Sequence, residues 1–511
     1  MTGNNLIFKN TFFLVFRTSL SLLVSLYTTR IILEEMGVSG YGLFSVIYGA
    51  VGFFTFIVLA MNDSVQRFLS VKIGNEDHNG VRNVFKNGFL IYLLFGLILV
   101  SALFYFQDKV LEQVLNVSPD SASIAHKVYT FAALSIFILV IQTPFNALVL
   151  SFERMSFYAY MSIYDACSKL LLAFAIININ TLDKVSTYSF LLFVSSVIGF
   201  LIYLLFCIFN FKKYLVGGRF NGRVIKDLYS FSFWNVLGGF ASVSRIQGIN
   251  ILLNIFFSTT VNAAFAISNT VLNAINLLTQ SLITAIRPQI FKSFAASDMN
   301  RCNTLILFGS KFTFIFLAII SLPLIINTHE ILFIWLKNTP EYGVVFVRTI
   351  VIMALIDCLS FSIMAGIQAT GRIKAYQLLV GLVIFTNLPI TFFLLNKGYS
   401  PQFIAIPLIV TSLVNLNLRV YFLVSKGFFS FKRYYLSVVL PSVIPVIISF
   451  AVLFIIKTKV TIDNVVLTIL YSIFCSAFTT FLIWLMAFSV HEKKIIYQAI
   501  AKIFRIIKNK K

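Results

Sequence analysis

Among the arginines inside long apolar stretches of this 511-residue chain, three have further polar residues in the same stretch: Arg17, Arg245 and Arg419. A charged side chain within an apolar segment of membrane length is costly unless it lines water or finds a partner, so each arginine is a candidate functional residue. The planar guanidinium donates two parallel hydrogen bonds to phosphate or carboxylate oxygens. The three arginines are therefore candidate ligands for an anion, and phosphate oxygens fit their geometry best.

Other polar residues lie on the same predicted helical face as Arg17. On a helix that turns about 100° per residue, five polar side chains fall within roughly 80° of one another: Asn10, Arg17, Ser21, Ser25 and Thr28. Such a stripe suits the wall of a polar cavity. The alternative is that Arg17 extends its charge toward the nearer membrane surface. Arg30 lies off the stripe, and for it packing or extension toward the surface explains the position as well as contact with a ligand does.

Amides form a second stripe. Five of them lie within roughly 60° of one another on a helix over 261–285: Asn262, Asn269, Asn273, Asn276 and Gln280. Amides face lipid at a high cost but hydrogen-bond sugar hydroxyls well. Hydrogen bonds between helices are the alternative role. Shorter polar sets accompany the other two arginines: Asn235, Gln247, Asn250 and Asn254 near Arg245, and Thr411 and Asn415 near Arg419.

Only two carboxylates lie well inside apolar stretches, Asp165 and Asp357. Asp165 precedes Lys169 by four residues, a spacing that favours an ion pair within one helix. Asp357 has no basic partner on its own helix, so it is a candidate site for a coupling proton or ion; burial against a basic residue of another helix is the alternative. The histidines and cysteines lack ligand spacing, and no phosphate-binding glycine loop is present. We expect no metal, cofactor or catalytic residue.

The composition explains what positions these residues. Hydrophobic residues make up 59% of the chain and charged residues 11%, whereas a soluble domain carries about 25% charged residues. The apolar residues come in blocks of roughly 20, which span a bilayer as helices. The sequence predicts an all-α polytopic membrane protein with about fourteen spans: 8–33, 41–61, 87–106, 128–150, 158–178, 186–210, 231–257, 261–285, 303–327, 343–366, 375–395, 402–425, 435–456 and 464–489.

The net charge of +22 would indicate nucleic-acid binding in a soluble protein. Here the basic residues follow membrane topology instead. With the N-terminus in the cytoplasm, 26 of the 40 lysines and arginines fall in cytoplasmic segments and 7 on the opposite side. We therefore expect both termini in the cytoplasm and no nucleic-acid partner. The tail, 491–511, alternates apolar and basic residues at helical spacing and is expected to lie on anionic membrane lipid.

Short motifs recur within the chain at offsets of 216 to 221 residues. Gln66-Arg67-Phe68-Leu69-Ser70, followed by Asp77 and Arg82, resembles Arg287-Pro288-Gln289-Ile290-Phe291-Lys292, followed by Asp298 and Arg301. Phe157-Tyr158-Ala159-Tyr160 likewise matches Ile373-Lys374-Ala375-Tyr376. The offsets predict two six-helix bundles in the same orientation, 1–212 and 213–433, two additional helices over 434–490 and the tail. In transporters built from such repeats, the substrate site lies at the interface of the repeats.

Several segments resemble the bacterial O-antigen and polysaccharide flippases. They are Glu34-Glu35-Met36-Gly37-Val38-Ser39-Gly40-Tyr41-Gly42, Gln66-Arg67-Phe68-Leu69-Ser70, Pro144-Phe145-Asn146-Ala147, and Gln368-Ala369-Thr370-Gly371-Arg372. This family shares a superfamily with multidrug exporters and the lipid II flippase. The resemblance implies two bundles around a central cavity. It also implies transport of undecaprenyl-pyrophosphate-linked oligosaccharide from the inner to the outer leaflet of the bacterial cytoplasmic membrane.

The resemblance also implies the partners: a lipid-linked oligosaccharide as substrate, membrane lipids, and other polysaccharide-assembly proteins. Export of a drug or of lipid II is the nearest alternative. A polymerase or ligase of the same pathway is a further one, but such enzymes need a sizeable outer loop, and the longest outer loops here, 107–127 and 328–342, are short. Nothing in the sequence resembles the selectivity filter of a channel.

Overall fold

The computed structural model describes residues 24, 27–28, 31–32, 34–37, 40–41, 43–44, 46–114, 121–179, 183–257, 259–336, 341–459, 464–488 and 492–493. Within these residues every regular element is a helix, which confirms the predicted all-α class. In this described part of the chain, twelve helices are long and apolar enough to cross a membrane. α9 (Thr259–Ala295), which carries the amides, is not among those twelve. Most of the predicted first span, 8–33, lies outside the described residues.

The described residues form two compact units, one ending at Gly239 and the other beginning at Phe240. The first unit contains α2 (Thr55–Gly74), α3 (His78–Tyr105), α4 (Gln107–Lys109), η1 (Val110–Val114), α5 (Ala122–Ser151), α6 (Met155–Asn178), α7 (Lys184–Leu215) and the beginning of α8 (Gly222–Phe256). α5 is its central helix, because α2, α3 and α7 all pack against it. Its buried face includes Ala133, Leu148 and Val149, which are fully buried.

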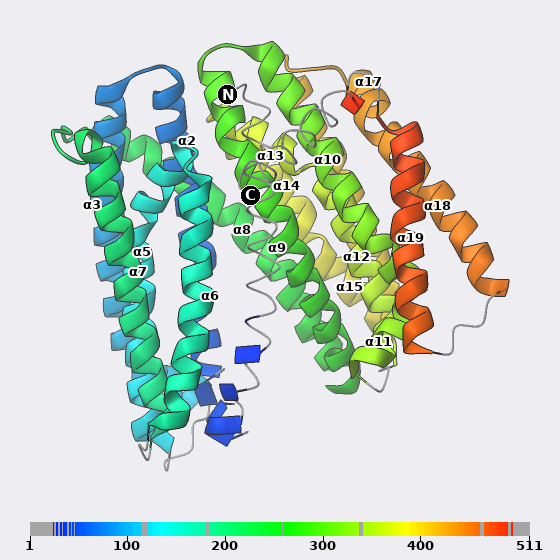
Figure 1. The fold of residues 1–511 in the computed structure, drawn as a ribbon, viewed down its shortest axis with the longest axis horizontal. Helices are drawn as coiled ribbons and strands as arrows, with labels where there is room; N and C mark the ends of the chain where they lie inside the picture. Colours follow the sequence, from blue (N-terminus) through cyan, green and yellow to red (C-terminus); the bar gives the residue numbers. More distant parts are fainter. Residues whose placement is uncertain are drawn as a thin grey trace, which may run out of the picture. The chain divides into compact units, whose positions relative to one another are not determined.

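The second unit begins within α8 and continues with α9 (Figure 1). It then contains α10 (Met299–Ile326), α11 (Thr328–Leu336), α12 (Gly343–Leu359), α13 (Phe361–Ala369), α14 (Lys374–Phe385), α15 (Asn387–Asn396), η3 (Pro401–Ile404), α16 (Ala405–Val424), α17 (Phe431–Tyr434), η4 (Tyr435–Val439), α18 (Leu440–Lys459) and α19 (Val465–Met486). α10 contacts α9, α12, α18 and α19 and is the most central helix of this unit.

Two of the membrane-length segments in this unit are broken helices. One break falls at Ser360, between α12 and α13, and the other at Thr386, between α14 and α15. At the first break the Ser360 hydroxyl donates to the carbonyl of Asp357 at 2.8 Å, and the hydroxyl of Tyr434 donates to the carbonyl of Leu359 at 2.8 Å. Side-chain donors thus satisfy backbone groups that the break frees, as the membrane interior requires.

The helices are longer than the apolar runs from which they were predicted. α2 continues to Gly74, so Arg67 and Lys72 lie on a helix and not in the loop that the span 41–61 implied. α8 likewise begins at Gly222, nine residues before the predicted span 231–257. The reason is that the backbone keeps its own hydrogen bonds beyond the hydrocarbon layer, where polar side chains cost nothing. An apolar run therefore measures the membrane crossing and underestimates the helix.

The motifs that recur in the sequence form the same local structure in both units. Glu76 and Ser297 both adopt left-handed backbone, with φ of 55° and 59°. Each is followed by an aspartate that caps the next helix: Asp77 accepts from the Gly80 N–H at 2.7 Å, and Asp298 accepts from the Arg301 N–H at 3.0 Å. The two turns thus match in backbone and in cap. The limits of the two predicted bundles stay a prediction.

Candidate functional site

A polar cavity of about 590 Å³ lies within the second unit, between α8, α9, α12, α13 and α16. Ten residues that the sequence singled out line it: Arg245, Gln247, Asn250, Asn269, Asn273, Asn276, Gln280, Asp357, Asn415 and Arg419. They come from four separate stretches of the chain, and packing brings them together. The volume falls within the range of about 300–1,000 Å³ that is typical of small-molecule sites.

Arg245, on α8, is neutralised across the cavity by Asp357 of α12. Its Nη2 lies 3.4 Å from the Asp357 Oδ2, and the two side chains are only 10% and 17% exposed. The Nη1 reaches the Ser412 hydroxyl of α16 at 3.5 Å. The pair therefore joins three helices around one buried charge contact. This is the arrangement that the sequence analysis left open for Asp357, a basic neighbour on another helix.

Arg419 approaches the same segment from α16 and is 7% exposed. Its Nη1 donates to the Ser360 hydroxyl at 2.5 Å, directly at the break between α12 and α13. Ser360 in turn donates to the Asp357 carbonyl, so the broken helix connects the surroundings of both arginines. The break thus positions a carboxylate and a hydroxyl, three residues apart, beside two guanidinium groups.

The cavity carries a surplus of positive charge and of unused hydrogen-bonding groups. Arg245 and Arg419 face a single carboxylate, which leaves one positive charge over. Among the described residues, the Nε atoms of both arginines and the Oδ1 atoms of Asn250, Asn269 and Asn415 have no hydrogen-bond partner. Buried polar groups are normally paired. Their arrangement around a cavity indicates a polar ligand that takes up both the charge and the hydrogen bonds.

Other candidates are placed elsewhere or are not described. Arg17 lies outside the described residues, as does the side chain of Asn262 on α9. Asp165 belongs to the first unit, where it pairs with Lys169 at 2.8 Å on an exposed face of α6, as its spacing predicted. Within the described part of the chain, no group of His, Cys, Asp and Glu is suited to a metal ion.

Lys311, a further basic residue of an apolar stretch, is buried and paired. Its side chain is 6% exposed within α10, and its Nζ contacts the carboxylate of Glu492 at 2.9 Å. The ring of Phe488 lies 5.5 Å from the same ammonium group. The lysine is thus held by the segment that follows α19, a partner 181 residues away in the sequence.

Sequence reasoning missed two residues that hold the arginines, Ser360 and Ser412. Serine occurs throughout the apolar stretches, and nothing in its spacing marks these two. It also gave no role to the apolar side of the cavity, which Met353, Phe361 and Met364 form.

Comparison with known proteins supports the fold. The family model MatE matches residues 11–175. Among similar solved structures, a point-substituted MATE protein has a TM-score of 0.71 at 13% identity, covering 83% of this chain and 98% of that one. An outward-facing multidrug resistance MATE family transporter of the MOP superfamily gives 0.69 at 12% identity, covering 83% and 97%.

A MOP superfamily transporter from Pyrococcus furiosus, for which a binding pocket of reverse polarity is described, also gives 0.69 at 12% identity, covering 83% and 97%. None of the curated proteins matches the chain. At these identities the likeness concerns the fold: this multi-pass membrane protein has the fold of MATE transporters.

Proposed function

We propose that the protein is a flippase, which moves an undecaprenyl-pyrophosphate-linked oligosaccharide from the inner to the outer leaflet of the bacterial cytoplasmic membrane by alternating access. The observation that carries the proposal is the composition of the cavity: two buried arginines against one carboxylate, beside a row of amides. Guanidinium groups suit the pyrophosphate. Amides donate to and accept from sugar hydroxyls.

The geometry suggests how the substrate charge is received. Without substrate, Asp357 neutralises Arg245, and Ser360 accepts from Arg419. A phosphate that enters takes hydrogen bonds from both arginines and displaces Asp357 as counter-ion. The carboxylate then becomes available to a proton or cation, which would couple its uptake to substrate movement. Asp357 is therefore the first candidate for coupling, and Asp165, which is paired with Lys169, is the second.

An exporter of drugs or of lipid II is the second candidate function. The fold is equally compatible with it, and structures of this fold include a multidrug resistance transporter. The surplus positive charge of the cavity argues against an organic cation as substrate. Lipid II carries the same pyrophosphate, so the cavity alone does not separate the two. A polymerase or ligase is disfavoured because the similar structures are described as transporters.

The experiment is transport by purified protein in liposomes, with a fluorescent lipid-linked oligosaccharide, lipid II or an organic cation as substrate. We expect movement of the first and, for Arg419→Ala, a loss of roughly ten- to a hundredfold in substrate affinity, which corresponds to about 1.5–3 kcal/mol for one charged hydrogen-bonding partner. Arg419→Lys should lose less. Arg223→Ala, an exposed arginine at the start of α8, is the control. Transport of the organic cation alone would refute the proposal.

The proposal also includes the partners and the topology of the protein. Membrane lipids and other polysaccharide-assembly proteins are its expected partners, and both termini are expected in the cytoplasm. In a strain that lacks the gene, the protein should restore export of surface polysaccharide. Restored drug resistance without restored export would favour the second candidate.

A further inference from the structure

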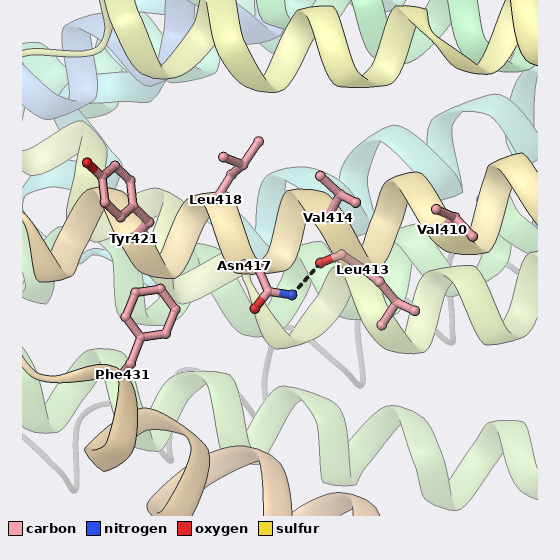
Figure 2. A pocket seen from close by; sticks show the side chains of 7 residues that line it. All are labelled: Val410, Leu413, Val414, Asn417, Leu418, Tyr421 and Phe431. Carbon is pink, nitrogen blue, oxygen red and sulfur yellow. Dashed lines mark hydrogen bonds between the residues drawn. The ribbon is translucent and has the colours of Figure 1, made fainter.

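A second hollow lies on the exposed face of α16, and Figure 2 shows its lining side chains. It has a volume of about 430 Å³ and is almost entirely apolar. Val410, Leu413, Val414, Leu418 and Tyr421 of α16 line it, together with Phe431 at the start of α17. Four of these side chains are between 42% and 55% exposed, so the hollow is an open groove.

The groove and the polar cavity lie on opposite faces of one helix. Asn415 and Arg419 of α16 are buried and line the polar cavity, whereas Val414, Asn417 and Tyr421 are exposed along the groove. The groove is therefore a separate site, and nothing proposed for the cavity bears on it. In a membrane protein its exposed apolar face meets lipid.

One amide interrupts the apolar lining. Asn417 donates to the carbonyl of Leu413 at 2.9 Å, which Figure 2 marks with a dashed line, and accepts from the hydroxyl of Tyr435 at 2.8 Å. An amide facing hydrocarbon is costly, and Tyr435 offsets part of that cost. From the end of α16 inward, the side chains along the groove change from Tyr421 and Asn417 to Leu413 and Val410. This order follows a phospholipid from headgroup to acyl chain.

Two basic residues follow Phe431, which lines one end of the groove, and the surrounding stretch of sequence carries no acidic residue. No Asp or Glu occurs between Asp357 and Asp463. Lys432 and Arg433 directly follow Phe431 and are exposed. Among the described residues, neither pairs with a carboxylate.

We propose that this groove binds an anionic glycerophospholipid, with the phosphate at Lys432 and Arg433 and an acyl chain along Leu413, Val414 and Leu418. The charge distribution of the sequence puts this end of α16 in the cytoplasm, where anionic lipid attracts basic residues close to the membrane. Charge complementarity decides the occupant: a zwitterionic lipid fills the apolar part equally well, but its net charge is zero, so it leaves the positive charge of the two basic residues uncompensated. Clusters of basic residues beside membrane helices commonly bind anionic headgroups.

The test is native mass spectrometry of the full-length protein in detergent, titrated separately with phosphatidylglycerol and phosphatidylcholine of identical acyl chains. We expect phosphatidylglycerol to bind more tightly. Each basic residue contributes about fivefold to binding of an anionic lipid, so Lys432→Gln with Arg433→Gln should weaken phosphatidylglycerol binding about thirtyfold and leave phosphatidylcholine unchanged. Lys212→Gln with Lys213→Gln removes the same charge from another exposed site and should change neither.

A second variant tests the apolar part independently. Val414→Trp fills the groove from an exposed position, so it should fold normally and weaken binding of both lipids. Equal binding of the two lipids by the unaltered protein would overturn the proposal, as would a double glutamine variant that binds phosphatidylglycerol as tightly as the control. Preferential binding of a polyprenyl phosphate over phosphatidylglycerol, abolished by Val414→Trp, would assign the groove to a different lipid and equally overturn it.

Discussion

The Arg245–Asp357 ion pair offers a way to separate the stability of the cavity from its function. Asp357→Asn keeps the size of the side chain but leaves the Arg245 charge without its partner. At the observed 3.4 Å, and with an effective dielectric constant of about 20, the attraction between the two charges is about 5 kcal/mol. Breaking a buried ion pair from one side commonly costs about 3–5 kcal/mol. The long contact favours the lower end, so we expect a loss of about 3 kcal/mol in the free energy of unfolding.

A double substitution should reverse the loss of stability without restoring transport. Replacing both partners with apolar residues of similar size, as in Arg245→Met with Asp357→Leu, removes the desolvation cost of two charges and is often neutral or stabilising. The free energy of unfolding should therefore return to near that of the unaltered protein. The double variant should not transport substrate, because its cavity has lost one of the two guanidinium groups.

Reversible unfolding in mixed detergent measures the stabilities, and the liposome assay measures transport. For the unfolding measurement alone, the matched control is Asp165→Asn, since the Asp165–Lys169 pair is more than half exposed at the aspartate and should contribute about 0.5 kcal/mol or less. Two results would refute the reasoning. Asp357→Asn could change stability no more than the control, which would mean that the pair is solvated. Alternatively, the double variant could transport normally, which would exclude Arg245 as a ligand.

Three further predictions concern other parts of the chain. Reporter fusions should place Gly218 in the cytoplasm and Lys459 outside, and the reverse at either position would contradict the predicted topology. Arg17→Ala should impair export severely and Arg17→Lys only partly, because a lysine lacks the rigid fork that binds two oxygens; full export by a well-inserted Arg17→Ala protein would exclude the role. Hydrogen bonds from Lys72 and from the Gly80 N–H lower the pKa of Asp77, so its contribution to stability is present above its unfolded value of about 4 and is lost as the pH falls further. Unfolding measured between pH 7 and 3 should therefore depend less on pH in Asp77→Asn, and an unchanged dependence would show that this cap does not contribute.

The amides of α9 show what a sequence pattern predicts well. Residues spaced at helical periodicity share a face in any straight helix, so the stripe from Asn269 to Gln280 required only that the segment be helical. All four described members line the cavity. The pattern also predicts that this face points into the protein, because amides that faced lipid would be costly.

The partner of each buried charge was beyond the same reasoning. Arg245 and Asp357 are 112 residues apart, and Lys311 and Glu492 are 181 apart. Which helices become neighbours depends on packing over the whole unit, and no local period records it. The break at Ser360 was missed for a related reason, since a hydroxyl that satisfies a freed carbonyl looks in the sequence like any other serine in a helix.

Because the turns at Asp77 and Asp298 match, the residues that line the cavity can be compared with their counterparts in the first half of the chain. If the two halves are aligned by the offsets of 216 to 221 residues, Asp357 corresponds to a position within 136–141 and Arg419 to one within 198–203, and neither range contains a charged residue. With the offset of these turns, the amides of α9 correspond to Tyr48, Gly52, Thr55 and Leu59. The halves thus repeat the turns and caps that build the helices but not the side chains that line the cavity. One half of the chain is sufficient to carry the charged residues of such a site, because the proposed pyrophosphate requires only one set of guanidinium groups. Under the proposed function, we therefore expect the described residues that recognise the substrate to lie in the second unit, so that substitutions that change specificity cluster on α8, α9, α12 and α16.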